Sequence, residues 1–274
     1  MALLQCNFFS TSLCFGTNVD VFLPSITPND EEDGGERDYP GGNGRFQVLY
    51  LLHGAYDDHT SWLLQTSIAR YAQDRCLAVV MPSVSNSFYQ DMFYGSAYLT
   101  YMTRELPQFI ESMFPVSVRR ENTFVAGNSM GGYGAIRLAL EQPERFCACD
   151  SLSGAIDVAE NIRLFSDGSV PGPFRFDCIF SDSEMSGLEK TDADLFHLIA
   201  GRRAQGTPLP KIFQTCGTED FLYPANCASR RKLAELGVDL TYEEHPGVHG
   251  WKYWDENICR VLDWFPLAHG PVEE

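Results

Sequence analysis

A serine between two glycines is the residue whose type and surroundings point most directly to chemistry. Ser129 lies in Gly127-Asn-Ser-Met-Gly131, between an apolar, β-rich run and a helix start rich in small residues. A serine hydroxyl is a weak nucleophile at neutral pH, so it must be exposed and placed beside a base. A sharp strand-to-helix turn does this, and flanking glycines avoid the Cβ clashes that such a turn creates. The pattern also fits a structural turn, but its context predicts a nucleophile at Ser129, with the Met130 N–H directed at a developing oxyanion.

A nucleophilic serine of this kind needs an acid and a base later in the chain, in that order. Asp220 follows an apolar run, so a loop would present it, and Glu219 beside it is the alternative acid. His249 comes immediately before the last helical pattern and is the predicted base. His245 is the alternative base, but Pro246 behind it keeps its backbone extended and favours a structural role. The sequence therefore predicts a Ser129–Asp220–His249 triad, in which the acid fixes the imidazole tautomer.

A second oxyanion donor is expected where the buried run before His53-Gly54 ends. The backbone N–H of Ala55, or alternatively that of Tyr56, would supply it. A lone histidine at a strand end is more often a hydrogen-bonded scaffold residue than a base, so His53 is assigned that role.

Four aromatic residues are candidates for the lining of a substrate pocket, although each fits a core position equally well. They are Tyr56, Trp62, Tyr94 and Trp251. The cluster Asp57-Asp58-His59 has the residue types of a metal site, but it offers too few oxygen ligands and has no second cluster to match it. We expect neither a metal nor a cofactor.

Strand and helix patterns alternate along the whole chain, which predicts one doubly wound, mostly parallel sheet with helices on both faces. The expected strands are Leu3–Ser10, Asn18–Leu23, Phe46–Leu52, Leu77–Met81, Asn122–Ala126, Cys147–Leu152, Lys211–Thr215 and Val238–Glu243. The expected helices are Ser67–Arg75, Tyr98–Phe114 with a kink at Pro107, Gly134–Gln142, short pieces within 184–200, Asn226–Leu236 and Trp251–Phe265. We expect one domain over residues 1–274, with a flexible acidic loop at 26–45 and a small cap at about 156–206.

The amino-acid composition limits the classes of partner that the protein is expected to bind. Twenty Lys and Arg against 37 Asp and Glu give a formal charge of −17, which disfavours nucleic acid and anionic membrane surfaces. The nine scattered cysteines show no zinc spacing and are read as small apolar residues in a reducing compartment. No run approaches eighteen apolar residues, and the N-terminus lacks a signal-peptide pattern, so a cytoplasmic protein acting on a small molecule is expected.

Several motifs together resemble the esterase D-like branch of the α/β-hydrolases, which includes tributyrin esterases, S-formylglutathione hydrolases and some feruloyl or acetyl-xylan esterases. The resemblance covers about residues 3–266 and is most specific at the nucleophile and at the last histidine. Its motifs are Val48-Leu-Tyr-Leu-Leu-His-Gly54, Ser61-Trp62, Ala78-Val-Val-Met-Pro82, Gly127-Asn-Ser-Met-Gly-Gly-Tyr-Gly134 and His249-Gly-Trp-Lys-Tyr-Trp254.

The resemblance implies a cofactor-free esterase for short acyl esters, often a dimer or tetramer. It assigns the nucleophile, acid and base to Ser129, Asp220 and His249, and the oxyanion donors to Met130 and Ala55. The dedicated S-formylglutathione hydrolases carry a Ser-Gly-Leu-Thr-Cys type of oxyanion segment, whereas this chain has His53-Gly-Ala-Tyr. A serine carboxylesterase is therefore predicted. An acyltransferase and an S-formylglutathione (thioester) hydrolase are the alternatives on the same triad.

Overall fold

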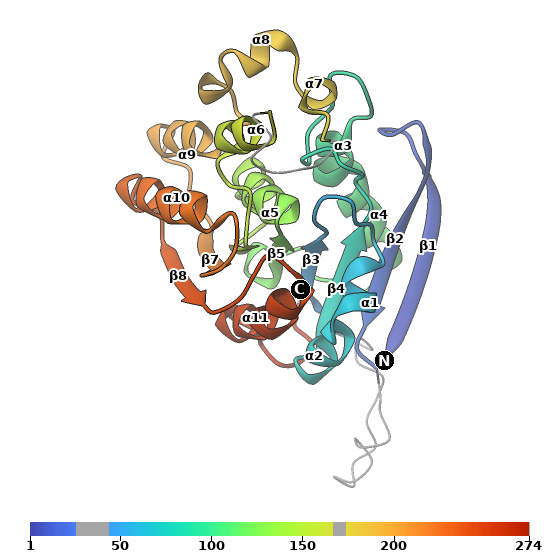
Figure 1. Cartoon of the computed structure of the whole chain (residues 1–274). Helices are drawn as coiled ribbons and strands as arrows, with labels where there is room; N and C mark the ends of the chain where they lie inside the picture. The colour runs from blue at the N-terminus through green and yellow to red at the C-terminus, as the bar shows by residue number, and fades with distance from the viewer. Residues whose placement is uncertain (26–43, 167–173, 274) are drawn as a thin grey trace, which may run out of the picture.

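A computed structural model describes residues 1–25, 44–166 and 174–273. The predicted acidic loop at 26–45 lies, apart from its last two residues, outside the described residues. Eight strands form one mixed sheet in the order β1-β2-β4-β3-β5-β6-β7-β8 (Figure 1). The strands are β1 (Ala2–Ser10), β2 (Phe15–Leu23), β3 (Gln47–Leu52), β4 (Leu77–Pro82), β5 (Thr123–Asn128), β6 (Ala148–Leu152), β7 (Lys211–Gly217) and β8 (Leu240–His245).

The sheet is antiparallel only at one edge, where β1 pairs with β2 and β2 pairs with β4. From β4 to β8 all neighbouring strands are parallel. Every residue of β3, β4 and β5 is buried, which explains why these strands are continuous apolar runs without alternation. Side chains of β3 alternate between two cores: Tyr50 and Leu52 pack on one face of the sheet, and Leu49 and Leu51 on the other.

Helices cover both faces, as the sequence predicts. The core that contains Leu49 also contains residues of α1 (Ser61–Gln65), α2 (Ile68–Asp74) and α11 (Trp251–Trp264). The opposite core contains residues of α4 (Leu106–Met113), α5 (Met130–Glu141), α9 (Leu195–Ala204) and α10 (Tyr223–Glu235). The predicted doubly wound, mostly parallel sheet is confirmed.

The helix expected over Tyr98–Phe114 is divided into three parts. It consists of α3 (Tyr98–Thr100), a π-helical turn (Tyr101–Glu105) and α4, which carries Pro107 in its first turn. Proline has no N–H to donate to the carbonyl four residues earlier, which is that of Thr103. The side chain of Gln142, from the end of α5, donates to this carbonyl at 2.6 Å instead. The predicted irregularity at Pro107 is therefore a change of helix type ahead of the proline.

Between β6 and β7, in the segment predicted as a cap, the described residues form four helices. They are α6 (Val158–Ser166), α7 (Phe176–Ile179), α8 (Asp182–Met185) and α9, with a 3₁₀ turn at Leu188–Lys190. Figure 1 shows α6, α7 and α8 together at one end of the molecule, above α5. A second 3₁₀ turn, Arg120–Asn122, leads into β5.

Two general properties of the chain concern membrane-spanning helices and disulfide bonds. Within the part of the chain that the structure describes, no helix is both long enough and apolar enough to cross a bilayer. All nine cysteines are free. The reading of them as buried apolar residues holds for Cys149 and Cys216, whereas Cys14 is exposed and the other six are partly exposed.

Candidate active site

Ser129 occupies the turn between β5 and α5 in a backbone conformation that L-residues rarely adopt. Its φ is 54° and its ψ is −117°. Backbone hydrogen bonds hold this turn, because the Ser129 N–H donates to Leu152 O at 2.9 Å and its carbonyl accepts from Gly132 and Ala155, each at 3.0 Å. Such strain persists only where the surroundings determine it, and it is typical of functional sites. The helix also begins at Met130, four residues earlier than expected, so the serine directly precedes its first turn.

The glycines on either side of Ser129 are required by close contacts. A Cβ on Gly127 would lie 2.5 Å from the backbone of Gly131, and one on Gly131 would lie 2.5 Å from Leu52 O. Real Cβ atoms do not approach other atoms so closely. The Gly-x-Ser-x-Gly spacing therefore allows α5 to start close against β3 and β5, which fixes the position of the serine.

A chain of hydrogen bonds joins the three residues predicted as a triad. His249 Nε2 lies 3.0 Å from Ser129 Oγ, and His249 Nδ1 lies 2.8 Å from Asp220 Oδ2 and 3.0 Å from Oδ1. The side chain of Asp220 is fully buried, and the N–H of Leu222 donates to its Oδ1 at 2.8 Å. These distances lie within the range in which a base accepts a proton from a nucleophile and an acid orients the base.

The two alternative residues are engaged elsewhere. His245 is the last residue of β8, and its Nε2 lies 3.0 Å from Glu243 Oε2. Glu219 accepts from the backbone N–H of Gly247 and from the Thr218 hydroxyl, and these bonds lower the pKa of its carboxyl. Glu219 thus supports the loop that leads to His249, because its own N–H also donates to Gly247 O at 3.1 Å.

The backbone amides predicted as oxyanion donors lie beside the serine. Met130 is the first residue of α5, so its N–H has no partner within the helix. Ala55 lines the same pockets as Ser129. The alternative donor, the N–H of Tyr56, donates to Asn86 Oδ1 at 2.7 Å. Because the Tyr56 N–H is engaged in this way, the amides of Met130 and Ala55 stay the predicted oxyanion donors.

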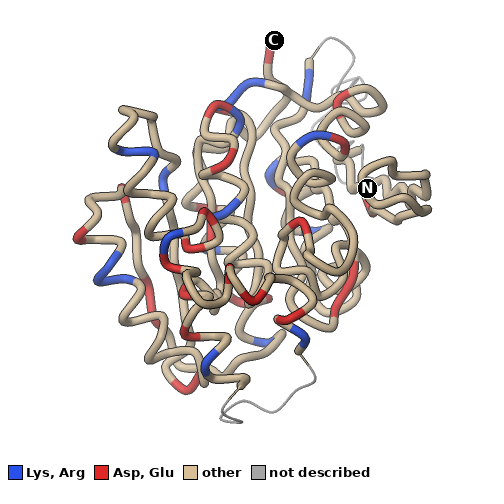
Figure 2. Tube along the Cα trace, turned by 90° about the horizontal axis from the view of Figure 1, so that it is seen from above, with Lys and Arg blue, Asp and Glu red and all other residues tan. Residues whose placement is uncertain are grey.

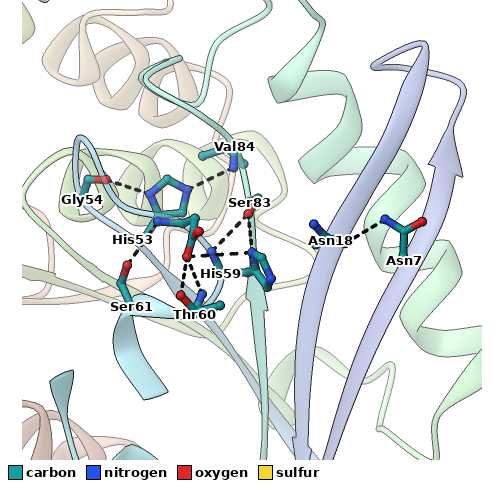
Figure 3. A network of polar contacts seen from close by, with 10 residues as sticks. Asn7, Asn18, His53, Gly54, His59, Thr60, Ser61, Ser83 and Val84 are labelled. Carbon is teal, nitrogen blue, oxygen red and sulfur yellow. Dashed lines mark hydrogen bonds and ion pairs between the residues drawn. The ribbon is translucent and has the colours of Figure 1, made fainter. Parts of the chain in front are cut away.

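His53 holds the turn that carries Ala55. Figure 3 shows its ring between Gly54 and Val84. The Val84 N–H donates to Nε2 at 3.0 Å, so the proton is on Nδ1, which donates to Gly54 O at 2.7 Å. Burial lowers the pKa of His53 to about 4, so the ring is neutral at physiological pH. This is the scaffold role assigned to His53 from the sequence.

Two pockets meet at Ser129. The narrow one has a volume of about 20 Å³ and is almost entirely apolar; Ala55, Phe88, Ser129, Met130, Ala155, Asn161, Phe165, Phe174, Phe221 and Leu222 line it. The wider one has a volume of about 220 Å³; Gly54, Ala55, Tyr56, Asp57, Asn128, Ser129, Phe165, Phe221, His249 and Trp254 line it. Both volumes open onto the nucleophile, but only the wider one is lined by His249.

Of the four aromatic residues predicted for the substrate pocket, Tyr56 lines the wider pocket, and the other three line neither pocket. Trp62 is buried in the core, where its Nε1 donates to Leu52 O at 3.0 Å. Trp251 packs edge-on against Trp62, with ring centroids 5.2 Å apart. Tyr94 is 70% exposed and pairs with Phe93. These three predictions are wrong. The side chains of Trp62 and Trp251 pack in or against the core, and that of Tyr94 is exposed to solvent.

Sequence reasoning missed the residues that line the pockets in their place. Trp254 lies one helical turn after Trp251, and its ring packs edge-on at 5.1 Å from His249. Phe221 directly follows the acid, with its ring 4.6 Å from the same imidazole. Both stand within five residues of a triad member, which is a signal that could have found them. Phe88, Phe165 and Phe174 carry no such signal, since only the tertiary fold brings them together.

The remaining acidic cluster does not form a metal site. Asp58 accepts from the N–H and hydroxyl of Thr60, and His59 Nδ1 lies 2.8 Å from Ser83 Oγ (Figure 3). Asp57 faces the wider pocket instead. In the described parts of the chain, no group of three or more His, Cys, Asp or Glu could hold a metal ion.

A hydroxyl, an imidazole and a buried carboxylate in series at the carboxyl edge of a parallel sheet define the class of serine hydrolases on the α/β-hydrolase fold. The Esterase family model matches residues 37–265. The chain belongs to the Esterase family, and it is a serine carboxylic ester hydrolase.

Relatives and solved structures agree with this assignment. The acetyl esterase of Caldicellulosiruptor saccharolyticus is 31% identical, with 96% of this chain and 98% of that protein covered. The substrate-bound structure of FphF, a fluorophosphonate-binding serine hydrolase of Staphylococcus aureus, is 32% identical, with a TM-score of 0.84 and coverage of 96% and 98%. The S-formylglutathione hydrolase FrmB of the same organism is also 32% identical, with a TM-score of 0.81 and the same coverage. The mycolyltransferase Ag85B of Mycobacterium intracellulare is 27% identical, over 80% of this chain and 74% of that protein.

Proposed function

We propose that this protein hydrolyses short-chain acyl esters by double displacement, with Ser129 as nucleophile, His249 as base and Asp220 as orienting acid. The observation that carries the proposal is the unbroken series of hydrogen bonds from Ser129 Oγ through His249 to the buried Asp220, at 3.0 and 2.8 Å.

In the first step, Ser129 Oγ attacks the ester carbonyl while His249 Nε2 takes its proton. The carbonyl oxygen becomes an oxyanion, which the N–H groups of Met130 and Ala55 stabilise. When the tetrahedral intermediate collapses, the bond to the leaving oxygen breaks and His249 returns the proton to that oxygen. Water then repeats the sequence on the acyl-enzyme, releasing the acid and restoring Ser129. Asp220 stabilises the imidazolium in both halves.

The narrow pocket supports a short acyl group. Phe88, Phe165 and Phe174 form its wall, and Phe174 packs against the first two with centroid distances of 5.2 and 5.6 Å. Displacing closely packed aromatic rings costs free energy. A volume of about 20 Å³ beside the nucleophile fits an acetyl-sized group rather than a long chain. Phe165 and Phe174 belong to the segment 156–206, for which we propose the role of a specificity cap on a single domain.

The test is a p-nitrophenyl ester series from two to twelve carbons, measured on the wild type and on Ser129→Ala. Acetyl and butyryl esters should turn over fastest, and the variant should lose on the order of 10⁴-fold in kcat or more. It should keep its thermal melting temperature and escape labelling by a fluorophosphonate. Ser112→Ala, a change on the outer face of α4, is the matched control. Activity of Ser129→Ala within tenfold of the wild type would refute the assignment.

Two alternatives on the same triad have specific support. The 32% identity to FrmB favours hydrolysis of a thioester such as S-formylglutathione, and the similarity to Ag85B favours transfer of the acyl group to an alcohol. S-formylglutathione hydrolysis can be followed directly. Product analysis with a competing alcohol separates transfer from hydrolysis.

Two further parts of the proposal concern the cellular compartment and the oligomeric state. Nine free cysteines support a reducing compartment such as the cytoplasm. A homodimer or homotetramer is proposed from the family resemblance, and analytical ultracentrifugation would test it.

A further inference from the structure

The two pockets at Ser129 have different chemical tasks if the proposed mechanism holds. The imidazole that protonates the leaving oxygen must stand beside that oxygen when the tetrahedral intermediate collapses. His249 lines the wider pocket and does not line the narrow one. The wider pocket therefore receives the leaving alcohol.

One carboxylate lies in this leaving-group pocket. Asp57 is half-buried there, in the loop that follows the end of β3 at Leu52. Burial raises the pKa of its carboxyl. A partly desolvated carboxylate is stabilised by a positive charge nearby and destabilised by a negative one.

The other residues that line the pocket also favour a positive charge. Tyr56, Phe221 and Trp254 contribute aromatic rings, and the negative face of an aromatic ring attracts a cation. No Lys or Arg belongs to the lining among the described residues. Figure 2 shows acidic positions spread across the chain, several of them near the centre of the view. The formal charge of −17 therefore adds to the local attraction.

We propose, on the basis of the ester hydrolysis described above, that the leaving-group pocket selects esters of cationic alcohols, such as amino alcohols and their quaternary ammonium analogues, and that Asp57 determines this selection. The cation lies against Asp57 and the aromatic rings while its ester oxygen faces His249. An anionic leaving group is disfavoured, because its charge would meet the carboxylate in a pocket without a basic side chain among the described residues.

The experiment uses three acetate esters of similar size on the full chain: acetylcholine, its neutral isostere 3,3-dimethylbutyl acetate and the anionic 2-sulfoethyl acetate. We expect kcat/KM to fall in that order, with cationic over neutral by about tenfold at low salt. In Asp57→Asn this ratio should fall to about twofold, whereas Asp57→Glu, which keeps the charge, should retain most of it. The ratio cancels any general loss of activity in a variant.

Asp58→Asn is the matched control. This neighbouring carboxylate bonds to Thr60 and lies outside the pocket lining, so its removal should leave the ratio unchanged. A wild-type ratio near one, a ratio that survives in Asp57→Asn, or an equal loss in Asp58→Asn would each overturn the proposal. If the wild type also fails to hydrolyse p-nitrophenyl acetate, the esterase function itself is wrong. Normal hydrolysis of that neutral ester without charge selection refutes the Asp57 inference alone.

Discussion

At the scale of single residues, three residues that line the pockets have a backbone conformation that is uncommon for residues other than glycine. Ser129, Tyr56 and Phe88 all line the pockets, and all have φ between 51° and 70° although none is glycine. Each such residue costs about 1–3 kcal/mol of strain, which the surrounding contacts must offset. Ser129 lines both pockets, whereas Phe88 lines the narrow one and Tyr56 the wider one.

His53 shows how a residue without a direct chemical role can hold the turn of a proposed oxyanion donor. It accepts from Val84 and donates to Gly54, and the Tyr89 hydroxyl donates to its carbonyl at 2.9 Å. Its ring is neutral, because a charged imidazole could not accept from the Val84 N–H. The two hydrogen bonds thus hold the turn that carries Ala55, the residue proposed as the second oxyanion donor.

We therefore predict that His53→Ala lowers kcat for p-nitrophenyl acetate by about tenfold to a hundredfold, with a smaller change in KM, because one oxyanion donor loses its position. Steady-state kinetics at pH 7.5 measures both constants. His59→Ala is the control, since His59 bonds to Ser83 outside the pockets and its loss should change kcat less than threefold. A wild-type kcat in His53→Ala would show that Ala55 is held by other contacts.

At the scale of elements, the sequence predicts most of the sheet and the order of the site. All eight expected strands are present, because buried parallel strands are continuous apolar runs that few other structures produce. The positions of Ser129, Asp220 and His249 could be predicted for a related reason. Each follows a strand at the same edge of the sheet, and the hydrolase order of the three types leaves few choices.

Other features depend on contacts that a sequence pattern does not contain. The first turn of α5 is Met130-Gly-Gly-Tyr, whose glycines disfavour helix in isolation. Gly131 is nevertheless needed for the approach to β3, and Gly132 for the approach to Ser151 and Gly154. The strand β8 starts at Leu240 rather than Val238 because its partner β7 sets the register, with Leu240 opposite Ile212. The pocket aromatics come from five separate segments, so their meeting could not be read from spacing.

One carboxylate links the β1–β2 hairpin to the helical segment before α4. Glu105, the last residue of the π-helical turn, accepts from the Ser10 hydroxyl at 2.6 Å and from the N–H groups of Thr11 and Ser12 at 2.7 and 3.0 Å. Burial alone would raise the pKa of this carboxyl, but the hydrogen bonds outweigh it and lower the pKa to about 2 from an ordinary value of 4.5. The ionised form is therefore the one that the folded chain stabilises.

The sign of the pH dependence follows from this lowered pKa. Between pH 4.5 and 2 the unfolded chain binds the proton and the folded chain does not, so the contribution of Glu105 is complete above about pH 5 and is lost as the pH falls to 2. We predict that Glu105→Gln lowers the free energy of unfolding by about 1–2 kcal/mol at pH 7, a value reduced for its partial exposure.

Urea denaturation at several pH values measures this difference, which should shrink steadily below pH 4.5. Glu189→Gln, at an exposed carboxyl in the 3₁₀ turn before α9, should show no difference at any pH. A loss in Glu105→Gln that is equal at pH 7 and pH 3 would mean that packing, not charge, is the source.

At the scale of the whole molecule, the excess of acidic residues is the dominant electrostatic feature. A formal charge of −17 on 274 residues produces repulsion between like charges that the compact state experiences more strongly than the unfolded chain. Ion pairs compensate part of it, as where Glu141 contacts both Arg137 and Arg202 at 2.7 and 2.9 Å. The uncompensated charges act over distances comparable with the Debye length, so added salt should screen them.

We predict that raising NaCl from 10 mM to 300 mM at pH 7.5 raises the melting temperature by about 2–4 °C, which corresponds to roughly 1 kcal/mol of relieved repulsion for a chain of this size. Differential scanning calorimetry measures the shift. The control is the same titration near pH 4.7, the isoelectric point of the sequence, where repulsion between net charges is absent and the rise should disappear. An equal rise of the melting temperature at both pH values would show that salt acts on apolar burial instead. A fall at pH 7.5 would mean that the ion pairs, not the excess negative charge, dominate the electrostatic free energy of the folded chain.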